Sequence, residues 1–327
     1  MRVGKLPEKV WKRSVLKQIK EKREEVVIGA GIGEDCAVFS LGDGKMTAMS
    51  SNIGYWPGTD TAQFPLYRSV NALAAMGAEP VAVDVSVLLP KEAEEVFIKG
   101  MTAQIEERCA LLKIQIAGCR INIIGMVRHP VVAVAGIGKL PDGDVPSIKR
   151  IKPEMDIVAS KWIGLEGTGF LAKNREEELL SKYPARFLAE AKRFERFLSV
   201  LPEAATAVKS GVCAMHSVAE GGIFGALWEM AAGAGVGLEI DLKKIPVRQE
   251  TIEICEYFEI NPYETASGGC LLMVADKGYD LVRKLEKEHI PAQLIGKTTA
   301  NNDRIVVNED ERRFLEPGKP DEIDKII

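Results

Sequence analysis

The chain has 327 residues, 46% of them hydrophobic and 28% charged, which allows two ordinary domains with packed cores and excludes a disordered protein. A formal net charge of −4 argues against a broad nucleic-acid-binding face. The six cysteines are scattered singly and there are only three histidines, which excludes a disulfide framework and a histidine-rich zinc site. The apolar stretch at 221–240 is broken by Glu229 and several glycines, and no signal-peptide core follows the N-terminus, so we expect a soluble, cytoplasmic protein.

The first half of the chain shows strands separated by turns and by helices. Apolar spacing predicts a helix over 7–22, and short β-like runs follow at 25–28, 36–41 and 45–51. The next predicted elements are a helix at 61–76, a strand at 81–89, a helix at 91–111 and strands at 113–117 and 130–138. This mixture predicts an α+β sheet layered with helices.

The segment 139–153 is rich in Pro, Gly and charge, which indicates a boundary between domains at 1–145 and 146–327. Beyond it we expect a second, α/β domain with strands at 157–160, 237–240, 269–275 and 292–295. Its predicted helices lie at 165–172, 184–197, 203–210, 221–232, 249–258 and 279–289. The tail at 316–327 is expected to be exposed and weakly ordered.

The glycine-rich loop 29–38 is the most informative segment. Gly29, Gly31 and Gly33 lie between two predicted strands, and Glu34 and Asp35 come just before the second. Glycines let backbone N–H groups converge on an anion, and a carboxylate beside them is able to hold Mg²⁺ bridging phosphates. The alternative is a tight β–β connection whose glycines only satisfy positive φ. It is not a dinucleotide fingerprint, because a strand follows.

Two further glycine motifs precede predicted helices. In the stretch 216–222, Glu220, Gly221 and Gly222 stand at a free helix N-terminus that favours anions, although a simple N-cap explains the pattern equally well. In the stretch 164–169, Glu166 and Thr168 occupy the first turn of a helix, as in an ordinary capped start.

Seven motifs follow one another along the chain: GIGEDCAV, VNALAAMGAEPVAV, AGCRI, RHPVVAVAGIG, GLEGT, MHSVAEGG and ASGG. Their order resembles the AIR synthase superfamily, which includes aminoimidazole ribonucleotide synthase (PurM), selenophosphate synthetase, thiamine-monophosphate kinase and HypE. GLEGT and the later LIGKTTANNDRIVV are most similar to the HypE-like, AIR-synthase-related branch. The resemblance runs from about residue 4 to 315.

The resemblance implies an ATP-binding protein in which Mg²⁺ ions bridge the phosphates. It also implies a homodimer, in which the N-terminal domains pair into a β-barrel and nucleotide lies in a cleft formed with the second domain. The residues that fall on the family's cofactor-binding positions are Gly29, Gly31, Gly33, Asp35, Asn52, Asn71, Gly118, Arg120, Glu166, Thr168, Glu220, Gly221 and Gly222.

The metal positions depart from the family's pattern. Of four places where the family carries acidic ligands, only Asp35 keeps its carboxylate. The other three places hold Asn52, Ala72 and Cys119, the last between Gly118 and Arg120. Triphosphate carries about four negative charges and needs compensating cations, so we expect weakened Mg-ATP chemistry. The terminal cysteine of HypE is also missing, since the last cysteine here is Cys270.

The leading prediction is therefore a HypE-like homodimer that binds ATP or another phosphate ligand through a degraded metal site. One rival is an active ATP-dependent phosphotransferase or dehydratase that uses a rearranged Mg²⁺ site at Asp35, Glu34 and Asp60. Another is a purely structural partner of an intact paralogue.

Overall fold

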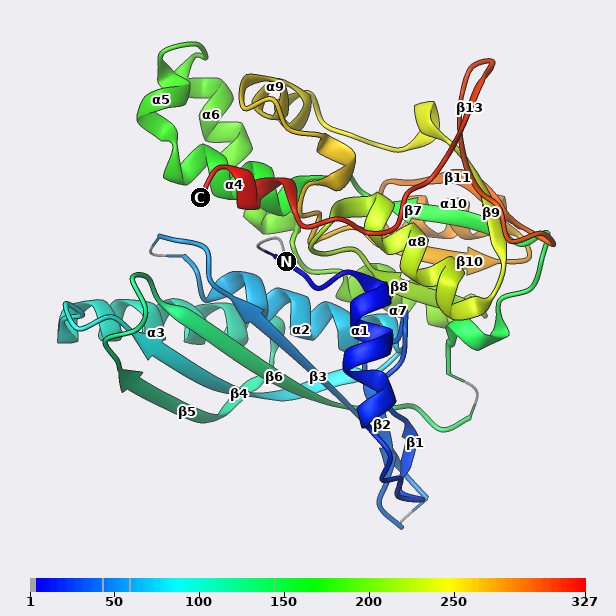
Figure 1. Ribbon diagram of the computed structural model, residues 1–327, viewed down its shortest axis with the longest axis horizontal. Coiled ribbons are helices and arrows are strands. Elements are labelled where there is room, and N and C mark those ends of the chain that lie inside the picture. Colours follow the sequence, from blue (N-terminus) through cyan, green and yellow to red (C-terminus); the bar gives the residue numbers. More distant parts are fainter. Residues whose placement is uncertain (1–3, 43, 59, 144) are drawn as a thin grey trace.

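The computed structural model describes residues 4–42, 44–58, 60–143 and 145–327. Two β-sheets, one from each half of the chain, lie in separate layers with helices between and around them (Figure 1). The strands of the first sheet end at Lys139 and those of the second begin at Asp156, so the predicted linker falls between the two sheets. In the described part of the chain, no helix is both long and apolar enough to span a membrane.

The first sheet has the order β1-β2-β3-β6-β4-β5 and is antiparallel except between β4 and β5. These two parallel strands are joined by α3, the crossover that parallel pairing requires. Burial alternates along β4 and β6, so that one face of the sheet packs on the core. The strands are β1 (Val26–Ile28), β2 (Ala37–Ser40), β3 (Met46–Gly54), β4 (Glu79–Leu89), β5 (Gln115–Ile123) and β6 (Val131–Lys139).

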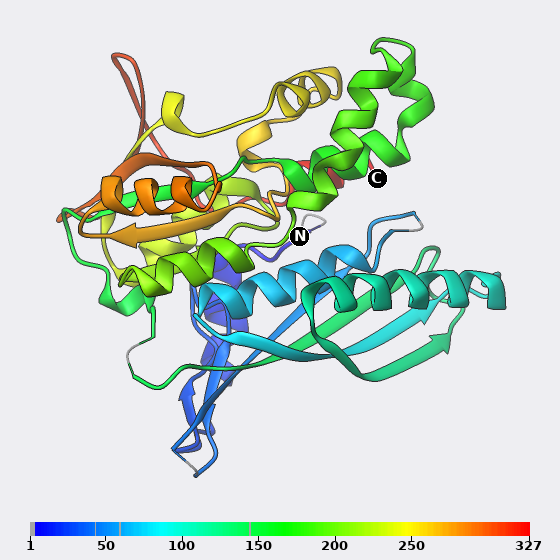
Figure 2. The same cartoon turned by 180° about the vertical axis from the view of Figure 1, so that it is seen from behind.

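Helices α2 (Gln63–Ala75) and α3 (Glu95–Leu112) cover the same face of this sheet (Figures 1 and 2). All residues of α2 are buried, because the helix contacts β3 and β6 on one side and α7 and β8 of the second half on the other. A helix buried on every side belongs to the core of a larger unit. Helix α2 is therefore the element on which the two halves meet.

The second sheet has the order β13-β12-β9-β11-β7-β10-β8. The interior strand β7 (Asp156–Ser160), which lies between β11 and β10, is almost wholly buried, as expected for a short apolar run covered on both faces. The other strands are β8 (Ala214–Ser217), β9 (Gly237–Asp241), β10 (Leu271–Ala275), β11 (Ala292–Thr299), β12 (Arg304–Asn308) and β13 (Glu311–Phe314).

The remaining helices surround this second sheet or extend beyond it. The N-terminal helix α1 (Glu8–Ser14) lies near α8 (Figure 1), where the Trp228 indole donates to Glu8 at 2.7 Å. The others are α4 (Leu165–Asn174), α5 (Glu176–Leu180), α6 (Ala185–Lys192), α7 (Leu201–Lys209), α8 (Gly222–Ala234), α9 (Gln249–Tyr257) and α10 (Gly278–Lys287).

Several predicted bounds change. The helix predicted over 7–22 is only α1 followed by a 3₁₀ turn at Leu16–Gln18, and none of α1 is buried, so no packing lengthens it. Strand β5 runs on to Ile123 because it pairs with β4 along its whole length. Strands β8, β12 and β13 were not predicted.

The prediction of an exposed, weakly ordered tail at 316–327 is wrong. Ile323 is completely buried, in a cluster with Phe170 and Leu171 of α4. Asp321 and Glu322 are also buried, and each accepts a hydrogen bond from a backbone N–H group. The tail therefore packs as part of the second half of the molecule.

Candidate functional site

A pocket of about 870 Å³ opens between the two halves of the molecule. Its lining comes from the N-terminal segment, the glycine-rich loop, the end of β3, the β8–α8 connection and the tail. Aromatic side chains contribute to it as well as charged ones, among them Trp11, Tyr55 and Trp228. A large cleft between domains with a few convergent polar groups is the usual form of a small-molecule site.

The glycine-rich loop packs backbone to backbone against α8. Gly33 has a φ of 72°, and a Cβ there would lie 2.7 Å from the carbonyl oxygen of Glu229. From the other side, a Cβ at Gly233 would lie 2.4 Å from the carbonyl oxygen of Ile32. Both glycines are needed for this close approach, which holds the loop on the second domain and places Asp35 in the pocket.

Asp35 joins the two halves through three hydrogen bonds. It accepts from the Ser217 hydroxyl at 2.8 Å and from the Ser217 backbone N–H at 3.3 Å, and its Oδ2 lies 2.9 Å from Nδ1 of His216. Both partners are at the end of β8. Both carboxylate oxygens of Asp35 are thus already engaged by the second half of the molecule.

His216 stands between two carboxylates. Its Nε2 lies 3.6 Å from Glu229 of α8, and Glu229 in turn pairs with Lys5 at 2.5 Å. Burial alone would lower the pKa of His216, but Asp35 and Glu229 raise it to about 10. Burial would raise the pKa of Glu229, but His216 and Lys5 lower it to about 2. His216 and Glu229 are therefore both charged at neutral pH.

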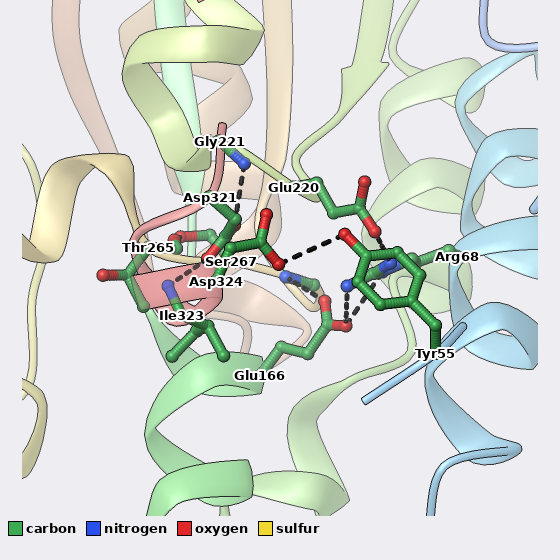
Figure 3. Close-up of polar contacts among 11 residues, drawn as sticks. Tyr55, Arg68, Glu166, Glu220, Gly221, Thr265, Ser267, Asp321, Ile323 and Asp324 are labelled. Carbon is green, nitrogen blue, oxygen red and sulfur yellow. Dashed lines mark hydrogen bonds and ion pairs between the residues drawn. The ribbon is translucent and has the colours of Figure 1, made fainter. Parts of the chain in front are cut away.

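A second charged group lies around Arg68 of the buried helix α2 (Figure 3). The Arg68 guanidinium pairs with Glu166 of α4 at 2.6 Å and also with Glu220. Glu166 accepts a further hydrogen bond from the backbone N–H of Gly268 at 3.1 Å. Burial alone would lower the pKa of Arg68, but the two glutamates raise it above its ordinary value, so Arg68 stays charged.

The tail closes this region. Asp321 accepts hydrogen bonds from the backbone N–H groups of Gly221 at 2.8 Å and Ile323 at 3.0 Å, and Tyr55 donates to Asp324 at 3.2 Å (Figure 3). Burial raises the pKa of Asp321 to about 7. The helix N-terminus where the sequence predicts an anion site therefore already binds a carboxylate of the chain itself.

Five of the predicted cofactor-binding residues other than Asp35 line the pocket. They are Gly31, Gly33, Asn52, Glu220 and Gly221. Of these, Asn52 donates to the Ser69 hydroxyl at 3.2 Å, and Glu220 is paired with Arg68.

The other predicted residues do not line the pocket. Asn71 uses both atoms of its amide on the backbone of Leu198 and Val200, where it ties α2 to the start of α7. Arg120 pairs with Asp84 at 2.8 Å on the first sheet, where Gly118 leaves room for the Asp84 carboxylate. The remaining residues outside the lining are Gly29, Glu166, Thr168 and Gly222. The Thr168 hydroxyl forms a hydrogen bond with Thr251, and the missing Cβ of Gly222 leaves room for the carbonyl of Tyr263.

The residues present do not fit a Mg²⁺ site. Mg²⁺ needs oxygen ligands in near-octahedral geometry, usually from carboxylates, phosphates and water. Asp35 is engaged by His216 and Ser217, and Ala72 brings no oxygen to the pocket. In the described ranges, no group of three or more His, Cys, Asp or Glu side chains is arranged to hold a metal ion.

The rearranged site of the rival prediction is not assembled either. Asp60 pairs with Lys173 at 2.5 Å, outside the pocket lining. Glu34 does line the pocket, but its side chain is nearly buried and lies 3.7 Å from Lys149. Burial raises the pKa of Glu34.

Sequence reasoning missed four charged residues that shape the site: Lys5, Arg68, Glu229 and Asp321. A buried ion pair of Arg68 was predictable from the sequence, because a lone arginine within the apolar helix 61–76 needs a buried partner. The others are recognisable only once the tail and the N-terminal segment are placed in space.

The full-length motif order is matched by models of a known family. Residues 33–140 match the AIR synthase related protein N-terminal domain, and residues 152–308 match the AIR synthase related protein C-terminal domain. A protein of Methanocaldococcus jannaschii named for hydrogenase expression and formation is 26% identical over 317 residues, which cover 93% of this chain and 91% of that protein.

Solved structures of hydrogenase maturation protein HypE have the same fold. HypE in complex with ATP superposes with a TM-score of 0.71 at 16% identity, covering 94% of this chain and 90% of that one. HypE in its complex with HypF gives a TM-score of 0.72 at 19% identity, covering 88% and 94%. By its two matching domains and their order, the chain belongs to the AIR synthase related family.

Proposed function

We propose that this protein is a HypE-like member of the family that binds ATP or another phosphate-bearing ligand in the interdomain pocket, without retaining Mg²⁺-dependent phosphoryl transfer. The observation that carries the proposal is the state of Asp35. This loop carboxylate lines a nucleotide-sized pocket, yet both its oxygens are bonded to His216 and Ser217. A relative with the same fold is solved with ATP, which supports a nucleotide as the ligand.

Calorimetric titration of the purified chain with ATP, with and without Mg²⁺, tests this proposal. We expect saturable binding at the pocket and no ADP release over hours. Tight Mg-ATP binding with rapid ADP release would support the active phosphotransferase or dehydratase instead. If the enzyme is active, Asp35→Asn should abolish turnover. Unchanged turnover in Asp35→Asn would contradict the hypothesis of a rearranged Mg²⁺ site.

We also propose that the protein is a homodimer formed by the open face of the first sheet. Helices α2 and α3 cover one face, and on the other face large apolar side chains are exposed on neighbouring strands: Met49, Ile53, Leu88 and Ile137. Such a contiguous apolar face marks an interface. Light scattering on Met49→Lys/Ile137→Lys should give a folded monomer, whereas a wild-type monomer would contradict the proposal.

A role in hydrogenase maturation rests on the relatives. One relative is named for hydrogenase expression and formation, and HypE has been solved with HypF. The test is deletion of the gene followed by a hydrogenase activity assay. Normal activity in the deletion strain would remove this part of the proposal.

A further inference from the structure

Ser217, at the end of β8, faces the carboxylate of the glycine-rich loop. Its hydroxyl donates to Asp35 at 2.8 Å. This donor occupies Oδ1 of Asp35, and His216 and the Ser217 backbone N–H occupy Oδ2, so a cation would compete with these donors for the same two oxygens.

His216 supplies a fixed positive charge at the same place. Its two ring nitrogens face Asp35 at 2.9 Å and Glu229 at 3.6 Å. The 2.9 Å contact with Asp35 is a hydrogen bond, whereas 3.6 Å is too long for one. His216 and Ser217 together therefore occupy both carboxylate oxygens of Asp35.

The pocket has little positive charge left for a ligand. Four cations line it: Lys5, Arg68, His216 and Lys319. Five carboxylates line it as well: Glu8, Glu34, Asp35, Glu220 and Glu229. Arg68 and His216 are buried in their ion pairs, so they cannot turn towards a ligand.

Only Lys5 and Lys319 are free to reorient. Their side chains are 49% and 44% exposed. Lys5 pairs with Glu229, and Lys319 pairs with Glu316 at 2.6 Å and with Glu264 at 3.3 Å. Exposed ion pairs contribute about 1 kcal/mol or less, so exchanging such a partner for a phosphate is inexpensive. Two lysines balance the charge of one phosphate group, about −2, but not the roughly −4 of a triphosphate without its metal.

We propose that the pocket binds a nucleoside monophosphate, or a ligand of the same low charge, without a divalent cation, with Lys5 and Lys319 contacting the phosphate. This inference rests on the proposed function, since it names the ligand class of that same pocket. The pocket volume and the aromatic lining leave room for a nucleoside beside the phosphate.

The experiment compares AMP, ADP and ATP by calorimetry on the full chain, each in EDTA and in Mg²⁺. We expect AMP to bind about tenfold more tightly than ATP in EDTA, and Mg²⁺ to change its Kd by less than about twofold. Affinity that rises from AMP to ATP in Mg²⁺ would overturn the inference and leave the nucleotide pocket intact. Absence of binding by all three nucleotides would overturn the proposed function itself.

A second measurement tests, without any nucleotide, whether the pocket binds a divalent cation. Mn²⁺ is titrated into the protein alone and followed by electron paramagnetic resonance. We expect no site in the wild type and in Ser217→Asn, and a gained site in Ser217→Asp, which differs from the control by one charge. Mn²⁺ binding by the wild type that Asp35→Asn abolishes would show that Asp35 is still a metal ligand and would overturn the inference.

The contribution of the lysines is tested with charge-neutral variants. Lys5→Met/Lys319→Met should weaken AMP binding about tenfold or more. Lys9→Met/Lys277→Met, which changes two exposed lysines outside the pocket lining, serves as the matched control. Equal AMP affinity in both double variants would contradict the assignment of the phosphate to Lys5 and Lys319.

Discussion

Arg68 and Glu166 come from different halves of the molecule and form an ion pair at 2.6 Å in which both side chains are at least 95% buried. Breaking a buried pair leaves an uncompensated charge in a medium of low polarity. Since the guanidinium also pairs with Glu220, this contact holds α2 against the second half of the molecule.

We therefore expect Arg68→Met to lower the free energy of unfolding by about 3–5 kcal/mol. Arg120→Met is the control, because its pair with Asp84 is largely exposed and should contribute about 1 kcal/mol or less. Urea denaturation of the two variants measures the difference. Equal midpoints would show that the buried pair does not stabilise the interface.

The tail gives a second stability prediction. Ile323 is completely buried, whereas Ile327 is 42% exposed. Ile323→Ala should destabilise by about 2–5 kcal/mol, because it removes buried methyl groups and leaves a cavity. Ile327→Ala should stay within about 0.5 kcal/mol of the wild type. Thermal unfolding monitored by circular dichroism separates the two, and a tolerated Ile323→Ala would mean that the tail does not pack in solution.

His216 makes stability depend on pH on the alkaline side. Its pKa rises from 6.5 to about 10 on folding, so the stabilisation is complete below pH 6.5 and is lost as the pH rises towards 10. The slope approaches 1.4 kcal/mol per pH unit within that window. In urea titrations between about pH 6 and 9, we expect His216→Gln to flatten the slope of the unfolding free energy against pH. His129→Gln, at an exposed position, should leave that slope unchanged.

Asp321 changes the stability in the same direction as His216, but over a more acidic range. Its pKa rises from 3.8 to about 7, so between these values the folded protein binds more protons than the unfolded chain. The free energy of unfolding therefore falls as the pH rises through this range. Asp321→Asn should remove that fall, and the exposed Asp142→Asn should not. A pH profile of Asp321→Asn that overlays the wild type would contradict this assignment.

Much of the fold was predictable because burial follows the apolar pattern. The buried strands β4, β6, β7 and β10 lie in runs that are mainly apolar, and each was predicted close to its observed bounds. The hairpin β12–β13 was missed because β13 reads Glu-Arg-Arg-Phe and is exposed throughout, so it exists through pairing alone.

The site was harder to predict, because its contacts depend on how the halves meet. The loop around Asp35 was identified from its glycines, but its partners His216 and Ser217 lie more than 180 positions away. Asn71 matched the motif, yet its amide satisfies the backbone of Leu198 and Val200. A motif predicts where a residue lies on its helix or strand, but it does not predict which neighbour forms hydrogen bonds with its side chain.

Helix α2 has a consequence for dividing the chain. Because it is buried on all sides, a fragment ending near Lys139 would expose to water the face that normally meets α7 and β8. Such a fragment should aggregate when produced alone, and recover a soluble form when it is co-expressed with the complementary piece from 146 onward. The two sheets are distinct in architecture, but we expect the smallest piece of this chain that folds unaided to contain both.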